Sequence, residues 1–443
     1  MIALRALTVR ARRSDFVRHG LLVFVGMMSA NGLLFVFYSF VSRALGVEQY
    51  GILISLMSAV LLVAVGPATV GATIVARLAA DLRAVDDRAR LRRLGDVVTS
   101  STALAGVVAF IVVGLLAGPI ARYLHLTTTI PVVLTGAALG LAFALPVQRG
   151  LFQGTEAFGL FAVSLFIEAA ARVVAGPLLA ARYGTDGALI GLCVGSFLSW
   201  AYNVVRLRRF GAEAVRLRLP FRHIFATSAN VSLAVLSINV LLFYDVIFVR
   251  HYFSSLTAGL YGAAALVGRA VYTIIGFLPT IVLPKASARS HSGHRTGSLL
   301  TMALGTGGAV VAAALLATAF APRLIVVLLA GRAFAAADGF VLAYTFALGA
   351  LAMANVVAMY KIGLQRFGFV VPLVGVALAE IAAVTIWHAT IGNVLLILCL
   401  GHALSLAAVF TGLPDRRLKS ASAGPAATAP GDSPFSSTRE GVS

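Results

Sequence analysis

Five ionisable side chains lie within long apolar stretches of the sequence, where charged groups are rare. They are Glu168, Arg172, Asp245, Arg269 and Glu380. An ionisable group in hydrocarbon costs a few kcal/mol or more, so each of these residues is a candidate functional residue by default. An arginine at such a position can bind an anion such as phosphate, whereas a carboxylate can relay a proton or bind a coupling cation.

The two arginines differ in their sequence context. Glu168 and Arg172 are four residues apart, on one face of a helix, and can neutralise each other. Either they form a salt bridge that holds their helix against a neighbour, or Arg172 also faces a cavity, because a guanidinium has five donors. Arg269 has no acid three or four residues away. Its partner is therefore a side chain on another helix, a backbone carbonyl, cavity water or a substrate anion. We expect Arg269 to face a cavity.

The two carboxylates outside this pair also admit more than one interpretation. Asp245 lies about one turn from the end of its apolar stretch, where it can bond backbone groups or tyrosines, pair with Arg250, or bind a coupling cation. Glu380 has no base nearby in the sequence and is either neutral and inert or a proton relay. We predict that His388 lies at the membrane interface and that His402 is a packing residue rather than a ligand.

The elements that carry these residues must be membrane helices. Of 443 residues, 60% are hydrophobic and 12% are charged, with a mean hydropathy of +0.97. Soluble proteins carry roughly 25% charged residues, so a water-facing globule of this composition is excluded. The net charge of +19 would suggest a nucleic-acid partner only if the basic residues lay on a polar domain. They lie in short runs between apolar stretches, so we predict no such partner.

A membrane-spanning helix needs about 20 apolar residues. This criterion predicts twelve spans with short loops between them, and no soluble domain of any size. The predicted spans are 21–42, 52–76, 97–117, 130–148, 158–181, 187–205, 224–249, 259–283, 298–321, 339–360, 367–389 and 391–413.

Basic residues set the orientation by the positive-inside rule. With the N-terminus in the cytoplasm, 27 of the 35 Lys and Arg residues fall on the cytoplasmic side and 6 on the other. Both termini are therefore expected to be cytoplasmic. The predicted organisation is a basic N-terminal segment (1–20), an N-terminal lobe (21–209), a basic inter-lobe loop (210–223), a C-terminal lobe (224–413) and a disordered tail (414–443). The basic loops after the second and sixth spans are expected to lie on the membrane as short helices that attract anionic lipids.

The segments outside the bilayer carry no constellation typical of an enzyme. The outer segments are short, and their acids are Glu48, Asp186 and Asp338. Paired carboxylates, a Ser/His/Asp arrangement and metal-ligand spacing are lacking in the sequence. Cys193 and Cys399 lie in apolar spans and are interpreted as small buried hydrophobes. We predict no enzyme, no metal and no cofactor.

The two halves of the sequence resemble each other in two places. NGLLFVFYSFVSRALGVEQYG begins at Asn31, and NVLLFYDVIFVRHYFSSLTAGLYG begins at Asn239; each carries an outer arginine, Arg43 or Arg250. QRGLFQGTEAFG near the end of the fourth span resembles KIGLQRFGF near the end of the tenth. Apolar runs also align by chance, but matched spacing at two places favours a true repeat. Six spans per half make the repeat parallel, with a binding site between the lobes near the midplane.

Several segments also resemble a known family. They are ALGVEQYGIL, RGLFQG, IEAAARVVAG followed by RYGTDGALIG, YDVIFVRHYFSSLTAGLYGAAALVGRAVY and the later LPKAS. Over residues of about 20–413 the chain resembles bacterial polysaccharide-biosynthesis proteins, the lipid-linked oligosaccharide flippases of the multidrug/oligosaccharidyl-lipid/polysaccharide exporter superfamily. This resemblance implies an all-α membrane protein with two six-helix lobes around a V-shaped cavity that opens alternately to either side.

The expected function is transport of a lipid-linked oligosaccharide across the bacterial cytoplasmic membrane. Arg172 and Arg269 are the candidates for binding its polyprenyl diphosphate. Asn31 and Asn239 either bond sugar hydroxyls or pack between helices. Arg149, near the inner end of the fourth span, either recruits anionic headgroups or only sets the topology. Polysaccharide assembly enzymes are further candidate partners.

Two alternative functions stay open. One is a multidrug/cation antiporter of the same architecture. The other is a membrane glycan polymerase or glycosyltransferase that acts on the same lipid-linked sugars.

Overall fold

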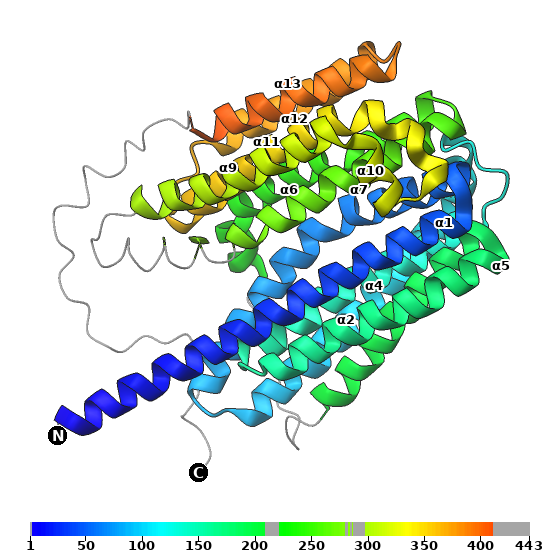
Figure 1. Cartoon of the computed structure of the whole chain (residues 1–443). Coiled ribbons are helices and arrows are strands. Elements are labelled where there is room, and N and C mark those ends of the chain that lie inside the picture. Colours follow the sequence, from blue (N-terminus) through cyan, green and yellow to red (C-terminus); the bar gives the residue numbers. More distant parts are fainter. Residues whose placement is uncertain (1, 209–220, 280–281, 284–285, 287–296, 411–443) are drawn as a thin grey trace.

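The computed structural model describes the whole chain except residues 1, 209–220, 280–281, 284–285, 287–296 and 411–443. For residues 2–24 and 221–228 it describes the backbone alone. The predicted inter-lobe loop and tail lie largely or wholly outside the described residues, so those two boundaries stay predictions. Figure 1 shows that the described chain is helical throughout.

Ten long helices account for most of the described residues. They are α1 (Ile2–Ala84), α2 (Arg88–Leu115), α4 (Ile130–Gly154), α5 (Phe158–Leu207), α6 (Phe221–Tyr252), α7 (Ser255–Ile275), α9 (Gly297–Phe320), α11 (Asp338–Gly363), α12 (Val370–Ile386) and α13 (Ile391–Phe410). Three short elements join them: α3 (Ala117–Tyr123), α10 (Pro322–Leu329) and the 3₁₀-helix η1 (Arg332–Ala337).

Two of the long helices each contain two spanning segments. α1 has 83 residues and breaks at Gly46, where φ is 73°; α5 has 50 residues and breaks at Gly184, where φ is 60°. Both glycines adopt left-handed backbone angles that other residues rarely accept, so the chain reverses there without a long loop. Nine described helices are long and apolar enough to cross a membrane, and α12 is a shorter apolar helix. Because α1 and α5 count twice, the predicted twelve segments are present.

The helices form the predicted pair of six-segment lobes. In the N-terminal lobe, α1, α2, α4 and α5 pack together; in the C-terminal lobe, α11 packs against α7, α9 and α13, and α12 packs against α6 and α13. Contacts between the lobes are made mainly by α1 against α6 and α7. We call the end of the bundle that holds Gly46, Gly184 and η1 the outer end, after the predicted orientation. The ribbons of the two lobes converge at this end and diverge toward the other (Figure 1).

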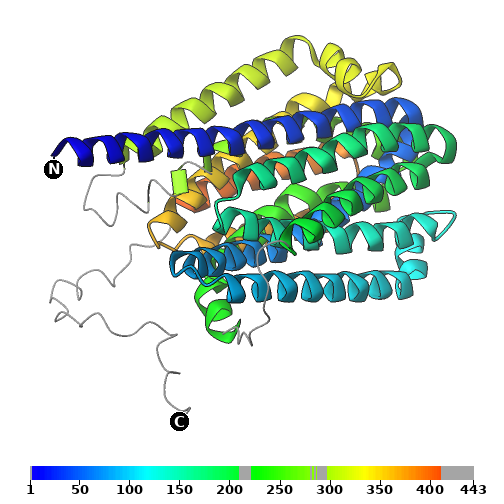
Figure 2. The same cartoon turned by 90° about the horizontal axis from the view of Figure 1, so that it is seen from below.

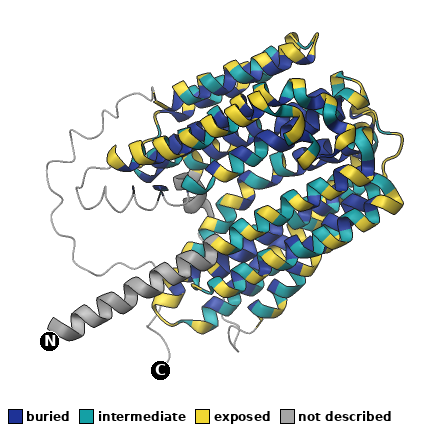
Figure 3. Cartoon of the chain, viewed as in Figure 1, coloured by how far each residue is buried: buried dark blue, intermediate teal, exposed yellow. Residues whose placement is uncertain are grey.

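The surface of the bundle is apolar, as a lipid-facing surface requires. Phe320 is 86% exposed and Val371 is 79% exposed, whereas many buried positions are small or polar. Exposed residues run along the helix faces that point away from the bundle (Figure 3), and the view from below shows the same layered packing of long helices (Figure 2). The protein is therefore a multi-pass membrane protein.

The basic stretch after the second span is not a separate surface helix. It forms the last turns of α1, a tight turn at Asp86 and the first turns of α2, which begins at Arg88. The carboxylate of Asp87 caps α2 by accepting a bond of 2.9 Å from the backbone N–H of Arg90. That expectation is wrong because continuous helices from both sides extend into the loop.

Candidate functional site

The N-terminal lobe contains a buried cluster of two arginines around one carboxylate. Arg149 Nη2 lies 2.6 Å from Glu168 Oε2, and Arg172 Nη2 contacts Glu168 Oε1. Arg149 also donates to the hydroxyls of Ser164 and Ser199, at 2.9 and 3.0 Å. With Glu168 ionised, the cluster retains one positive charge.

Arg149 does not lie at the membrane surface, where recruitment of headgroups would require it. It is an internal residue of α4 and only 7% exposed, so its guanidinium cannot recruit lipid headgroups at the surface. That expectation is wrong. Arg149 also no longer counts among the basic residues of the cytoplasmic loops. The reason is that its partner Glu168 is 19 positions away, on α5, beyond the reach of any local spacing rule.

Arg172 retains hydrogen-bonding capacity. Its Nη2 donates to Ser196 Oγ at 2.7 Å, but its buried Nε has no hydrogen-bond partner. The side chain is 20% exposed, more than that of Arg149 at 9%. The structure therefore contains the local salt bridge with Glu168 and leaves an unused donor on Arg172.

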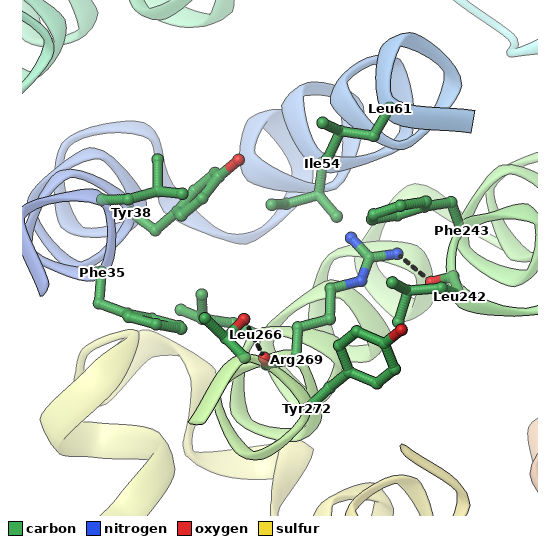
Figure 4. Close-up of a pocket in the computed structure, with 11 residues that line it drawn as sticks. Phe35, Tyr38, Ile54, Leu61, Leu242, Phe243, Leu266, Arg269 and Tyr272 are labelled. Atoms are coloured by element: carbon green, nitrogen blue, oxygen red, sulfur yellow. Dashed lines mark hydrogen bonds between the residues drawn. The ribbon is translucent and has the colours of Figure 1, made fainter. Parts of the chain in front are cut away.

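A pocket between the two lobes surrounds Arg269 (Figure 4). It has a volume of about 130 Å³ and is walled mainly by aromatic and aliphatic side chains from both segments of α1, from α6 and from α7. The lining residues are Leu34, Phe35, Tyr38, Ile54, Leu61, Leu242, Phe243, Leu266, Arg269, Tyr272 and Thr273. Arg269 is the one formally charged side chain in this set.

Contacts from both lobes hold the guanidinium of Arg269. Its Nη1 donates to Ser58 Oγ at 3.1 Å, and its Nη2 donates to the carbonyl of Leu242 at 3.2 Å. Its central carbon lies 4.9 Å from the ring centroid of Phe243, within cation–π range. The distance from Nη2 to Asp245 Oδ1 is 3.8 Å, and the buried Nε has no hydrogen-bond partner. Arg269 is thus fixed in orientation and only loosely neutralised.

Tyr38 lines the pocket from the first segment of α1, and the charges of both Arg172 and Arg269 act on its hydroxyl. Figure 4 shows Tyr38 and Arg269 projecting into the same space from different helices. Nothing in the sequence predicted Tyr38 as a site residue, because it lies in the aromatic run after Asn31, where core packing is the ordinary explanation.

Asp245 is completely buried in the C-terminal lobe behind the pocket. Its Oδ2 accepts hydrogen bonds from the hydroxyls of Tyr261, at 2.8 Å, and Tyr344, at 2.5 Å. Bonding to tyrosines was one of the interpretations from the sequence. Pairing with Arg250 is wrong, because Arg250 donates to the carbonyl of Leu124 at 3.0 Å.

Glu380 is also buried in the same lobe, at 3% exposed. Its Oε1 accepts a bond of 2.9 Å from the hydroxyl of Tyr244 and lies 3.4 Å from Nε2 of His402, while its Oε2 has no hydrogen-bond partner. The absence of a side chain at Gly401 makes room for this carboxylate. Tyr244 and Asp245 are consecutive residues of α6, so one helix carries a member of each of two buried polar groups, one around Glu380 and one around Asp245. His402, which the sequence predicted to be a packing residue, is the partner of Glu380.

The two asparagines of the repeat do not line the pocket. Asn239 is 7% exposed, and its amide donates to the carbonyl of Val235 on its own helix at 2.9 Å. Asn31 is half-buried on α1. Sugar binding by either residue stays a prediction.

Across the described part of the chain, no three His, Cys, Asp or Glu residues are grouped to hold a metal, and Cys193 and Cys399 are unpaired. The His388 ring packs against Tyr252 near the outer end, with a centroid distance of 3.9 Å and an angle of 34° between the ring planes.

Solved structures share this architecture. An inward-facing multidrug resistance MATE family transporter of the MOP superfamily superposes with a TM-score of 0.73 at 11% identity, over 88% of this chain and 96% of that one. The lipid II flippase MurJ in an inward closed conformation gives 0.68 at 14% identity, over 88% and 87%. An outward-facing conformation of a MATE family transporter gives 0.55 at 14%, over 89% and 93%. No protein-family model and no curated protein matches the sequence. The chain therefore has the fold of MATE and MurJ transporters.

Proposed function

We propose that the protein is a flippase that carries the polar head of a lipid-linked oligosaccharide across the bacterial cytoplasmic membrane by alternating access, with both termini in the cytoplasm. The observation that supports this most is the pocket between the lobes, whose one charged wall residue is the loosely neutralised Arg269. A sugar diphosphate cannot cross hydrocarbon alone, because unpaired polar groups cost several kcal/mol each. A cation fixed at the lobe interface offsets that cost for the diphosphate.

Arg172 supplies the second cation of the proposed site. It belongs to the N-terminal lobe and retains an unpartnered Nε, and Tyr38 lies within electrostatic range of both arginines. A diphosphate carries two charged groups, so one arginine from each lobe suits it better than a single cation. The pocket volume of about 130 Å³ is below the roughly 300–1,000 Å³ typical of sites for drug-sized ligands. It fits the diphosphate linkage, with the sugars extending toward the inner end.

A multidrug/cation antiporter is the second candidate, since MATE transporters share the fold. Asp245 is the observation in its favour, because it is the acid nearest to the pocket. However, both tyrosine hydroxyls occupy its Oδ2, and Arg269 stands between it and the pocket. A cationic ligand would meet the guanidinium first. The wall of the pocket therefore favours an anionic ligand over a cationic one.

We assign the coupling of transport to a proton gradient to the buried polar residues of the C-terminal lobe. Glu380 and His402 form a buried pair that can exchange a proton; Tyr244, which bonds Glu380, directly precedes Asp245 on α6, and Asp245 lies 3.8 Å from Arg269. Protonation of the Glu380–His402 pair would change the electrostatic field in the pocket. Anionic membrane lipids at the basic inner surface, and assembly enzymes that receive the flipped product, complete the proposed set of partners. No catalytic role is assigned to any residue.

Deletion in the source bacterium followed by lipid analysis tests the function. If the protein is a flippase, the deletion strain should accumulate the lipid-linked oligosaccharide in the inner leaflet. Loss of polymer with the intermediate already in the outer leaflet would indicate a polymerase or glycosyltransferase. In proteoliposomes, protein-dependent exposure of a fluorescent polyprenyl diphosphate sugar supports the flippase, whereas proton-driven uptake of a cationic dye alone supports the antiporter.

A further inference from the structure

The loops between α2 and α4 and between α9 and α11 each contain a short helix at the outer end, α3 in one lobe and α10 in the other. The last carbonyls of a helix have no intrahelical partner and need donors from elsewhere. At both short helices, side chains of the opposite lobe donate to carbonyls in the last turn or just after it, and the Val327 carbonyl also accepts from the backbone N–H of Gly331 at 3.1 Å.

Arg43 of the N-terminal lobe bonds the end of α10. Its Nη2 donates to the carbonyl of Leu328 at 2.7 Å and to that of Val327 at 3.2 Å. The neighbouring Ser42 hydroxyl donates to the carbonyl of Ala330 at 2.8 Å. At Gly331, φ is 106°, a backbone angle that favours glycine, and an added Cβ would lie 3.0 Å from Arg43 Cγ.

Arg250 of the C-terminal lobe bonds the end of α3 in the same way. Its Nε donates to the carbonyl of Leu124 at 3.0 Å, and its Nη2 donates to that of His125 at 3.4 Å. His251 Nδ1 donates to the carbonyl of Tyr123 at 2.7 Å, and the two rings stack at 3.9 Å. The donor role of Nδ1 follows because a carbonyl only accepts.

Between these two contacts the lobes meet backbone to backbone. An added Cβ at Gly51 would lie 2.9 Å from the nitrogen of Gly259, and one at Gly259 would lie 2.0 Å from the carbonyl oxygen of Val47. Gly51 is on α1 and Gly259 is on α7, so the crossing joins the lobes. No side chain fits there, and the outer end is closed.

We propose that Arg43 and Arg250 form a pseudo-symmetric latch that holds the outer end closed and releases when the cavity opens outward. The two residues match in the internal repeat, and each crosses to the other lobe. Their partners are backbone carbonyls at helix C-termini, which favour a cation. Once the lobes separate, water at the outer surface can hydrate the guanidinium groups and the carbonyls. Release therefore leaves no charge buried without a partner.

The two halves of the latch differ in strength. Arg250 is 3% exposed, whereas Arg43 is exposed to solvent. A charged hydrogen bond shielded from water contributes more than an exposed one. Arg250 therefore holds the closed state more strongly than Arg43.

Spin labels at the outer end test the latch. Ala181 near the break in α5 and Ala389 between α12 and α13 are both exposed and lie in different lobes. With Cys193 and Cys399 replaced by Ala, cysteines at these two positions carry the labels, and pulsed dipolar spectroscopy in lipid nanodiscs measures their separation. We expect one short-distance population in the unmodified chain. In the Arg43→Gln/Arg250→Gln variant we expect a long-distance population that is at least threefold larger.

The control is Arg323→Gln, which removes an exposed outer arginine at the start of α10. It should keep the short distance. Unchanged distances in the double variant would overturn the latch. If that variant does not fold, the exposed Arg43→Gln change alone must still enlarge the long-distance population, and an unchanged distribution there also counts against the proposal. The inference rests on the proposed alternating access, but the measurement uses no substrate, so a wrong substrate assignment leaves its outcome unaffected.

Discussion

Arg149 and Glu168 form an ion pair of 2.6 Å whose two side chains are 9% and 12% exposed. At the inner end of the same lobe, Arg83 and Glu156 form an ion pair of 2.7 Å whose side chains are 47% and 57% exposed. The two bonds have nearly the same length and opposite surroundings. They provide a matched pair for measuring how burial changes the contribution of an ion pair.

Replacing Glu168 with Ala should destabilise the protein by about 3–5 kcal/mol, because it leaves two buried guanidinium groups without their carboxylate. Replacing Glu156 with Ala should cost about 0–1 kcal/mol, since water solvates the freed Arg83. Thermal unfolding of both variants in the same detergent measures the difference. Equal midpoint temperatures would contradict the assignment of Glu168 as the centre of the buried cluster.

Replacing Arg269 with Gln should weaken binding of a soluble prenyl diphosphate, such as farnesyl diphosphate, by roughly 10- to 100-fold. The estimate follows from about 1.5–3 kcal/mol for a hydrogen bond to a charged group. Arg172→Gln should weaken it as well, and farnesol should bind both variants and the unmodified chain alike. Isothermal titration in detergent measures the affinities.

The exposed Arg182 near the break in α5 serves as the control for that experiment. Its replacement by Gln should leave the affinity unchanged, because it is remote from the pocket. A loss of affinity in Arg182→Gln equal to that in Arg269→Gln would show that net charge, rather than the pocket, governs binding.

The sequence predicted the fold well because its strongest signal acts within single segments. Apolar runs of about 20 residues marked all twelve spans, and an even number per half required parallel lobes. The breaks at Gly46 and Gly184 were hidden, since a glycine between two apolar runs does not reveal whether a loop or a sharp reversal follows.

The site was predicted only where partners are local. Glu168 and Arg172 were paired correctly because four residues bring side chains together on one helix. Arg149, His402 and Tyr38 were misplaced or missed, because each acts on a residue of another helix. Segment hydropathy determines which residues are in the membrane but not which faces of the helices meet.

His402 and Glu380 should govern the response to a proton gradient. Replacing His402 with Gln keeps a polar group of similar size but removes the titratable partner of Glu380, so an imposed pH gradient should no longer accelerate transport in proteoliposomes. His388→Gln is the matched control, since His388 lies near the outer end against Tyr252. A gradient response retained in His402→Gln would remove the pair from the coupling role.

Gly401 gives a test of the Glu380 site that leaves every ionisable group in place. An added Cβ at Gly401 would lie 1.9 Å from Glu380 Oε2, so Gly401→Ala must displace that buried carboxylate or separate α12 from α13. Overpacking of this kind costs about 1–3 kcal/mol. Gly375→Ala on α12 is the matched control, because an added Cβ there meets nothing within 4 Å. We expect Gly401→Ala to lower the midpoint temperature and the pH-gradient response together, and Gly375→Ala to change neither. A normal gradient response in a folded Gly401→Ala protein would show that the position of Glu380 does not control coupling.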